Sequence, residues 1–393
     1  MDIGIICGEL VTCEPSYECV LHDVVLKVDD KRIFSIDEEL GNVKKVIDAR
    51  DKTVMPGFID SHTHLIFGGN RANEFEEKLK GIPYEEILKR GGGIFNTVSA
   101  TRKTDRDTLK KLAIKWIRNA FRWGTTTIEI KSGYGLDKET ELKLLKIINE
   151  LKNILKIRVI PTFLVHVVPK ETERKKYITE IKETWIREFR EFAEFFDVFC
   201  DPHAISLDET KELLETAQKY GYKIKLHAEQ LAHYGGAKLA SKFNAISCDH
   251  LEYADEDDIK LLKEKGVVPV LLPGAYLYLG CKKAPPIELL RKHKVGFALA
   301  TDFNPGSSPI ISLLIIMNLA CTLWKITPLE AILGVTYYAA KSLGLNELGS
   351  IAPGKFADII ILNTSSYKEI PYWCGFNPVE KILVNGKEIQ DIM

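Results

Sequence analysis

The sequence lacks the features that would place the chain in a membrane, outside the cell or on a nucleic acid. No apolar run approaches the ~20 residues that span a bilayer. The eight cysteines include no Cys-x-x-Cys pair, which argues against a zinc ribbon and a disulfide framework. Lys and Arg total 54 against 55 Asp and Glu, so no net field attracts nucleic acid or an anionic membrane. Any selectivity for a charged partner must therefore be local.

The first residues and the length of the chain indicate where the protein is located and how many domains it has. Residues 1–4 are not followed by the apolar segment and small-residue cleavage site of a secretory signal, so we expect a cytoplasmic protein. A chain of 393 residues is too long for one small core. It suits a (β/α)₈ barrel, which takes roughly 250 residues, together with one additional module.

The order of apolar segments predicts such a barrel. From Pro56 onward, apolar runs alternate with amphipathic helical stretches, which is the pattern of βαβ units and a parallel sheet. Eight parallel strands close a TIM barrel. The eight runs that we predict as strands are 57–64, 125–132, 157–166, 195–203, 222–227, 245–252, 266–273 and 295–302.

The two ends of the chain predict a second domain. Residues 1–55 and 349–393 alternate short strands with turns, and each segment alone has too few strands to bury an apolar face. We therefore expect them to form one composite β-sandwich domain. The barrel would occupy residues 56–348, and after its eighth strand we predict two further helices at 310–324 and 327–343.

Most predicted strands end in a residue of a metal-binding type. Catalytic groups of parallel barrels lie at the C-terminal ends of the strands. His62 and His64 are separated by two, so both imidazoles point to one side of an extended strand and can share an ion. A single His-x-His motif is weak evidence for a metal site, because two polar residues in a loop can have the same spacing. The residues at the later strand ends are His166, Asp201, His203, His227, Asp249, His250 and Asp302.

Three imidazoles and one carboxylate make a plausible first set of ligands for zinc or ferrous iron, with room for a water. Such an ion lowers the pKa of bound water toward about 7 and polarises a carbonyl group. The pattern therefore predicts a metal-dependent hydrolase.

Two motifs carry a family resemblance. The segment 56–64, PGFIDSHTH, resembles the first-strand motif of the amidohydrolase superfamily, and 349–358, GSIAPGKFAD, resembles its C-terminal motif. The superfamily fold is a (β/α)₈ barrel with a composite β-sandwich. Within it, five further segments resemble the imidazolonepropionase family, and they lie at 67–71, 91–94, 131–136, 227–230 and 300–307.

The resemblance implies a reaction and a site. The reaction is hydrolysis of the cyclic amide C–N bond of 4-imidazolone-5-propanoate to N-formimidoyl-L-glutamate, in histidine degradation. The implied cofactor is one divalent metal ion, Zn²⁺ or Fe²⁺/Fe³⁺, held by His62, His64, His227 and Asp302. The implied partner is a small molecule with a carboxylate tail, and a homodimer is the family expectation. The implied substrate-binding residues are Arg71, Tyr134, His166, Gln230, Asn304, Gly306 and Ser307.

The sequence departs from the family pattern at Gln230, where some members have Glu. An amide cannot take a proton at neutral pH, so Gln230 can only orient substrate or water. Acid and base work then falls to His250 and Asp302. The fourth strand end, 199–201, offers no bridging lysine, which favours one metal ion over two.

Several of these residues have plainer interpretations. Arg71 can hold a carboxylate through two parallel hydrogen bonds, or it can be a surface arginine. Tyr134, between two glycines, either presents its phenol to a ligand or packs as a lid. His250 either relays a proton or is only structural. Glu129 and Lys131 share one face of the second strand and predict an internal ion pair.

Two other functions remain open. A nucleobase-type deaminase of the same superfamily would share the ligands but would not need Arg71. A catalytically silent scaffold would have lost ligands, and none is missing. Asp201 and His203 could hold metal ligands in place through hydrogen bonds without contacting the ion or the substrate themselves. We therefore leave both residues out of the site.

Overall fold

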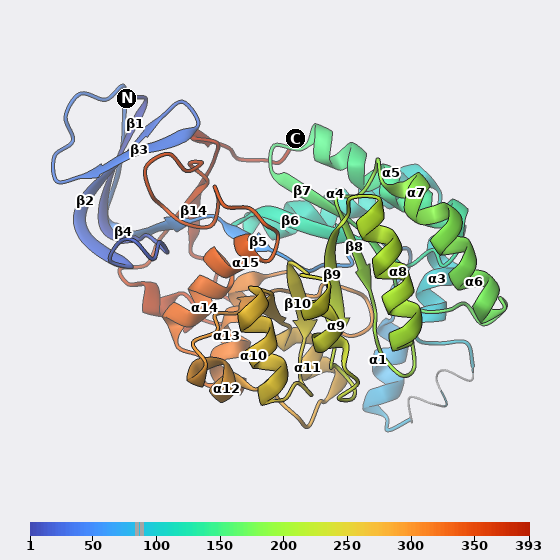
Figure 1. The fold of residues 1–393 in the computed structure, drawn as a ribbon. Coiled ribbons are helices and arrows are strands. Elements are labelled where there is room, and N and C mark those ends of the chain that lie inside the picture. Colours follow the sequence, from blue (N-terminus) through green and yellow to red (C-terminus); the bar gives the residue numbers. More distant parts are fainter. Residues whose placement is uncertain (83–85, 87–89) are drawn as a thin grey trace.

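The computed structural model describes residues 1–82, 86 and 90–393, and their strands form two separate sheets. In Figure 1 the N-terminal strands stand at one end of the molecule, and strands from the C-terminal segment lie beside them. The second sheet is surrounded by helices. The fold prediction is confirmed: a parallel eight-stranded barrel is joined to a mixed sheet built from both termini.

The smaller sheet joins the two chain ends through one central strand. β4 pairs in parallel with β1 on one side and antiparallel with β13 on the other, so residues near 50 and 360 become neighbours. All four residues of β13, IIIL, are buried: Ile359 and Ile361 pack into the same apolar cluster as β1, and Ile360 and Leu362 pack into the larger cluster of the barrel. In sheet order the strands are β15 (Lys387–Glu388), β14 (Val379–Val384), β13 (Ile359–Leu362), β4 (Lys45–Pro56), β1 (Ile3–Val11), β2 (Val20–Asp29) and β3 (Arg32–Asp37).

The barrel strands follow one another in chain order and all pair in parallel. The first and last strands approach each other beyond their ends, where Asp302 N donates to His62 O at 2.9 Å and His64 N donates to Phe303 O at 3.0 Å. The strands are β5 (Phe58–Asp60), β6 (Thr125–Lys131), β7 (Arg158–Val165), β8 (Phe195–Val198), β9 (Lys223–Ala228), β10 (Ser247–His250), β11 (Val268–Leu271) and β12 (Ala298–Leu299). These closing bonds place the ends of β5 and β12 side by side.

Local signals in the sequence fix where the helices begin. The Ser206 hydroxyl and the Glu209 carboxylate form a capping box at α8, and Asp255 and Asp258 form another at α10. The helices are α1 (Ala72–Leu79), α3 (Ile94–Lys103), α4 (Arg106–Arg122), α5 (Lys138–Ile154), α6 (Arg174–Glu180), α7 (Ile186–Phe189), α8 (Leu207–Lys219), α9 (Gly236–Lys242), α10 (Glu256–Lys265), α11 (Pro273–Leu279), α12 (Ile287–Lys292), α13 (Leu313–Trp324), α14 (Pro328–Gly334) and α15 (Tyr337–Lys341). A π-helix, η1 (Ile181–Trp185), joins α6 to α7, and a 3₁₀ turn, η2 (Tyr367–Glu369), precedes β14.

The single helix predicted at 327–343 is wrong, because two helices occupy this segment. The backbone breaks at Thr336, whose φ of −128° and ψ of −90° lie outside the helical region. The hydroxyl of this residue donates instead to Ile332 O at 2.6 Å. The change of direction lets both α14 and α15 contact β12.

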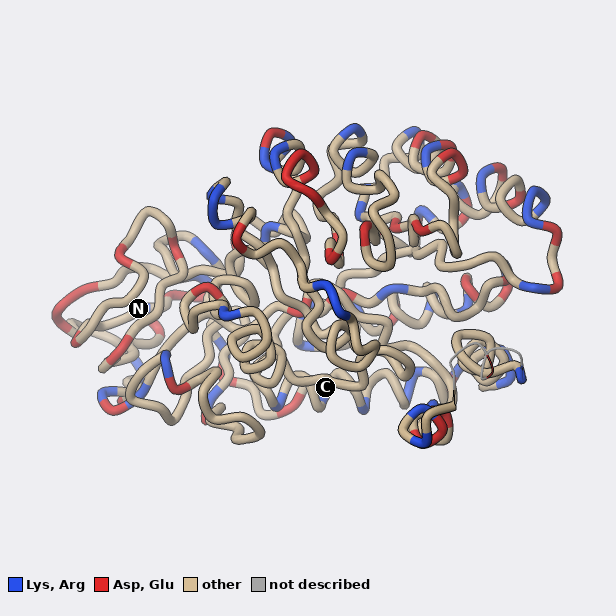
Figure 2. The backbone as a smooth tube through the Cα atoms, turned by 90° about the horizontal axis from the view of Figure 1, so that it is seen from below, with Lys and Arg blue, Asp and Glu red and all other residues tan. Residues whose placement is uncertain are grey.

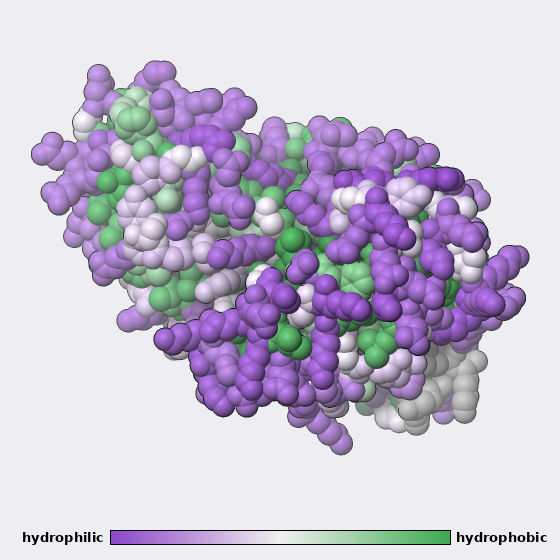
Figure 3. Space-filling view, in the orientation of Figure 1, coloured by the Kyte–Doolittle hydropathy of each residue, from purple (hydrophilic) through white to green (hydrophobic). Residues whose placement is uncertain are grey.

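The surface carries charges of both signs. Figure 2 shows Lys and Arg interspersed with Asp and Glu along the outer helices, as the balanced composition predicts. The face in Figure 3 is mainly hydrophilic, with small separate hydrophobic patches. In the described part of the chain, no helix combines the length and the apolar character that a membrane crossing requires.

Candidate metal centre

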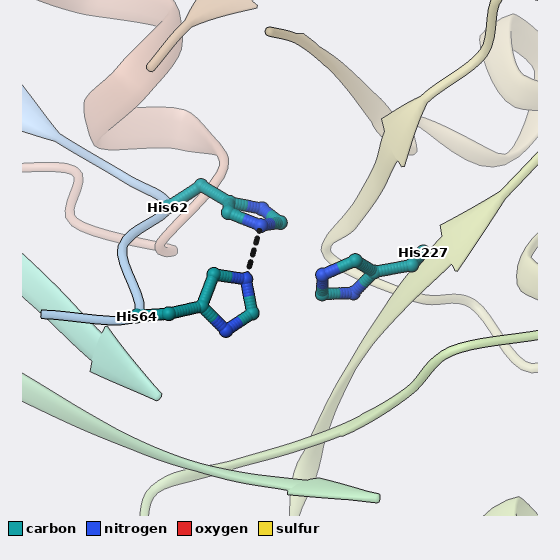
Figure 4. A group of neighbouring side chains, drawn as sticks. All are labelled: His62, His64 and His227. Atoms are coloured by element: carbon teal, nitrogen blue, oxygen red, sulfur yellow. Dashed lines mark hydrogen bonds between the residues drawn. The ribbon is translucent and has the colours of Figure 1, made fainter. Parts of the chain in front are cut away.

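Three histidines converge at one end of the barrel. His62 and His64 follow β5, and His227 belongs to β9. In Figure 4 the three rings turn toward one shared space. One ring nitrogen from each lies within 4.8 Å of the others, and all three side chains are buried. The predicted His-x-His pair and the third imidazole therefore form a single cluster.

Asp302 reaches the same cluster from the chain after β12. Its Oδ1 atom lies 3.5 Å from Nε2 of His62 and 3.3 Å from Nε2 of His64. Nε2 of His227 is buried without a hydrogen-bond partner in the described part of the chain. Because buried polar atoms are normally satisfied, this unpartnered nitrogen and the facing donor atoms fit a bound cation.

Two further carboxylates contact the Nδ1 atoms of His62 and His227. Nδ1 of His62 lies 2.6 Å from Asp249, and Nδ1 of His227 lies 3.1 Å from Asp197. If each Nδ1–H donates to its carboxylate, the lone pair of the opposite nitrogen, Nε2, faces the centre. The side chain of Asp201, which the sequence analysis considered for such a role, instead accepts the backbone N–H of His203 at 2.9 Å.

A buried lysine lies behind these carboxylates. Nζ of Lys131 is 2.8 Å from both Glu129 and Asp197 and 3.9 Å from Asp249. The predicted ion pair with Glu129 is confirmed. Burial alone would lower the pKa of Lys131, but the attraction of Asp197, Glu129 and Asp249 outweighs it and raises the pKa. Lys131 therefore remains charged although its side chain is fully buried.

Burial sets the protonation of the inward groups. It is the largest cause that lowers the pKa of His62 and of His64 well below the ordinary value, so both imidazoles are neutral and can bind a metal. Burial also raises the pKa of Asp302 to about 6. A carboxyl group with that pKa can accept and release a proton near neutrality.

The cluster opens into a cavity of about 740 Å³. His64, His227 and Asp302 line this cavity, and so does His250. The structure brings every sequence-predicted substrate-binding residue to the same cavity wall: Arg71, Tyr134, His166, Gln230, Asn304, Gly306 and Ser307. His203, which was left out of the site, lines the cavity as well.

Arg71 is held in place on two sides. Its Nε donates to Thr97 Oγ1 at 2.8 Å. Its guanidinium lies where a Cβ atom of residue 306 would be, with the Cζ atom only 2.6 Å from that position. Glycine at 306 therefore makes the room that Arg71 occupies. Three lysines also line the cavity: Lys78, which is on α1, and Lys282 and Lys283, which follow α11. The sequence analysis missed these three cations.

Asn304 shapes the loop after β12. Its side-chain oxygen accepts the N–H groups of Gly306 at 2.8 Å and Ser307 at 2.7 Å, and its amide donates to Asp302 O at 2.6 Å. These bonds form a tight turn of the kind that asparagine favours. The turn presents Gly306 and Ser307 to the cavity beside Asp302.

Comparison with known proteins shows the family of the chain. The model of the "Amidohydrolase family" matches residues 53–389. The imidazolonepropionase of Psychromonas ingrahamii is 45% identical over 353 residues, which are 88% of each chain. That of Aliivibrio fischeri is 45% identical over 378 residues, which are 94% of this chain and 93% of the relative.

Two solved structures share the fold at low identity. An adenosine deaminase from Xanthomonas campestris with bound zinc has a TM-score of 0.74 at 18% identity, covering 98% of this chain and 92% of that one. The atrazine chlorohydrolase of Arthrobacter aurescens complexed with zinc has a TM-score of 0.70 at 16% identity, covering 99% and 95%. The family match and the identities of about 45% over most of both chains show that this chain belongs to the amidohydrolase family and, within it, to the imidazolonepropionases.

Proposed function

We propose that this chain hydrolyses the ring C–N bond of 4-imidazolone-5-propanoate to N-formimidoyl-L-glutamate, a step of histidine degradation. The observation that carries the proposal is one cavity that contains both the histidine cluster with Asp302 and the cation Arg71. The cluster suits hydrolysis of an amide, and Arg71 suits a carboxylate tail. A nucleobase carries no such tail, so the same cavity supports a deaminase less well.

The proposed cofactor is one divalent ion bound by His62, His64, His227 and Asp302. Three imidazoles and one carboxylate suit zinc and iron alike. The zinc bound by the Xanthomonas campestris deaminase, which shares this fold, supports zinc as the ion. When bound, the ion lowers the pKa of a coordinated water toward about 7 and polarises the substrate carbonyl.

The acid and base roles fall to two side chains. Asp302 accepts the proton of the attacking water, because its carboxylate borders the histidine cluster where that water would be held. His250, whose buried ring is neutral, takes this proton from Asp302 and passes it to the leaving ring nitrogen as the C–N bond breaks, so both side chains return to their starting state. The ring of His250 lies 5.3 Å from that of His227 and 5.8 Å from that of His62, so it borders the reacting centre. Gln230, an amide, orients the substrate only.

The remaining cavity residues bind the substrate in this proposal. Arg71 holds the propanoate through its two terminal nitrogens, because its Nε is already engaged by Thr97. The ring of His166 stacks on that of His64 with centroids 5.6 Å apart, which places it to contact the heterocycle. The other proposed contacts are Tyr134, Gln230, Asn304, Gly306 and Ser307.

The direct test is turnover. Protein of measured metal content is mixed with freshly made imidazolonepropanoate, and the ultraviolet absorbance of the ring is followed together with formation of formimidoylglutamate. We expect the absorbance to disappear, and we expect no ammonia from adenosine, guanine or cytosine. Persistent absorbance with metal-loaded protein would reject this substrate. Light scattering tests the proposed homodimer as twice the chain mass.

Gly306→Ala tests how Arg71 is placed. The new methyl group would occupy the position of the Arg71 guanidinium, so that group must move. We expect KM for imidazolonepropanoate to rise about tenfold, a loss of ~1.4 kcal/mol, with kcat within twofold. In an Arg71→Ala background the same change should add nothing, because two substitutions that act through one contact are not additive. An additive effect would show that Gly306 acts independently of Arg71.

A further inference from the structure

Glu252 is a buried carboxyl that the proposed mechanism leaves without a role. It follows β10, is 1% exposed, and lies two residues after His250. Neither carboxyl oxygen has a hydrogen-bond partner in the described part of the chain. Burial raises its pKa to about 8. A carboxyl buried without partners weakens the folded state, so stability does not explain its presence.

The Glu252 side chain faces His250. Its Oε2 atom lies 4.0 Å from Nδ1 of His250, and that nitrogen is itself buried without a partner among the described residues. The backbone between them is unusual, because His250 has a φ of 83° and Leu251 a φ of 70°. Leu251 N donates to Ala228 O and Tyr253 N donates to Glu229 O, which hold this turn against the end of β9. The turn folds residue 252 back onto the ring of residue 250.

Two other histidines of this centre contact a carboxylate at hydrogen-bonding distance. Nδ1 of His62 meets Asp249 at 2.6 Å, and Nδ1 of His227 meets Asp197 at 3.1 Å. In both cases the carboxylate engages one ring nitrogen and leaves the other for the centre. His250 and Glu252 form a third pair of this kind, at a longer distance. Catalytic hydrogen bonds are often long without a ligand and shorten in the complex.

We propose that Glu252 is a positioning residue for His250. A carboxyl oxygen of Glu252 accepts the Nδ1–H of His250, which fixes the ring and its tautomer and leaves the lone pair of Nε2 free to take up and pass on a proton. A neutral imidazole has one donor and one acceptor nitrogen, and without a partner the two can exchange. The inference rests on the proposed function, in which His250 relays the proton from Asp302 to the leaving nitrogen.

Kinetics of metal-loaded Glu252→Leu and Glu252→Gln test the role. Leucine removes the hydrogen bond, so we expect kcat to fall about 30-fold with KM within twofold and metal content unchanged. Glutamine can still hydrogen-bond to Nδ1 and should restore kcat to within about threefold of the wild type. In a His250→Ala background, Glu252→Leu should change kcat less than twofold. A kcat for Glu252→Leu within twofold of the wild type, or an equal loss without His250, would overturn the proposal.

Stability separates positioning from a structural role. Glu252→Leu should melt at or above the wild-type temperature, because it removes a buried carboxyl without partners. The matched control is Glu9→Leu. Glu9 is also buried, but it accepts hydrogen bonds from Thr53 and from the backbone of Tyr367 in the small sheet. That variant should melt lower with unchanged kcat. If Glu252→Leu lowers the melting temperature in parallel with kcat, the carboxyl is structural.

A measurement without substrate completes the test. In ¹⁵N-histidine spectra of metal-loaded protein, the signals of His250 are those missing from His250→Ala. We expect one tautomer in the wild type and averaged ring shifts in Glu252→Leu. Averaged shifts in the wild type would overturn the proposal even if the leucine variant does not fold. If the wild type fails to consume imidazolonepropanoate but His250 keeps one tautomer, the proposed function fails and the pairing stands.

Discussion

Replacing His227 with Asn should lower kcat at least about 10⁴-fold and reduce bound metal from one ion per chain toward none. His227 supplies one of three imidazoles, and the remaining ligands come only from the two strand ends that close the barrel. Without His227, an ion would be bound by His62, His64 and Asp302 alone and would have no ligand from β9, across the barrel. Metal analysis after gel filtration, beside a turnover assay with added zinc or ferrous iron, measures both effects.

Chelation separates metal loss from damage to the fold. A ligand that binds only the folded protein raises its stability, so removal of the ion should lower the melting temperature of the wild type. The melting temperature of His227→Asn should not respond to the chelator. His22→Asn is the matched control, because His22 lies exposed on β2, outside the cluster. A His227→Asn protein with full metal content and turnover would remove His227 from the ligand set.

The strand order and the cluster could be predicted because their signals are local. Most barrel strands are short apolar runs that end in a polar residue, and the His62–His64 spacing places two rings on one side of a strand. All eight observed strands overlap the predicted ones. The helix predicted at 327–343 was wrong because its apolar pattern continues through Thr336, where only the packing of α14 and α15 on β12 imposes a break.

The supporting groups could not be predicted from local patterns. The contact of His62 with Asp249 joins residues 187 apart, and its distance depends on how the closed barrel brings β5 and β10 together. Nothing in the sequence near Gly306 indicates that this glycine makes room for Arg71, which lies 235 residues earlier in the chain (306 − 71). A carboxylate such as Asp197, inside an apolar run, could have been noticed as a polar residue in a strand interior. Its partner was not readable from the sequence.

Lys131→Met should destabilise the protein by about 3–5 kcal/mol, because it leaves buried carboxylates without their main counter-charge. The fully buried cluster contains two cations, Lys131 and Lys225, and three carboxylates, Glu129, Asp197 and Asp249. The substitution changes their net charge from −1 to −2. Asp197 and Asp249 would then orient His227 and His62 less firmly, so turnover should fall as well. Urea unfolding with the metal present measures the stability, and a loss below 1 kcal/mol would contradict this account of the cluster.

A second substitution tests whether charge balance is the cause. Glu129→Gln added to Lys131→Met returns the net charge of the cluster to −1, and it keeps a side-chain oxygen for the hydroxyl of Thr162, which donates to Glu129 at 2.5 Å. We expect the double variant to be more stable than Lys131→Met alone. Lys152→Met is the matched surface control: its partner Glu194 is 2.6 Å away and about a third exposed, so the loss should stay within about 1 kcal/mol. If the double variant is no more stable than Lys131→Met, the cost comes from lost packing of the lysine side chain. In that case packing, and not the charge of Lys131, would keep the histidines of the metal centre aligned.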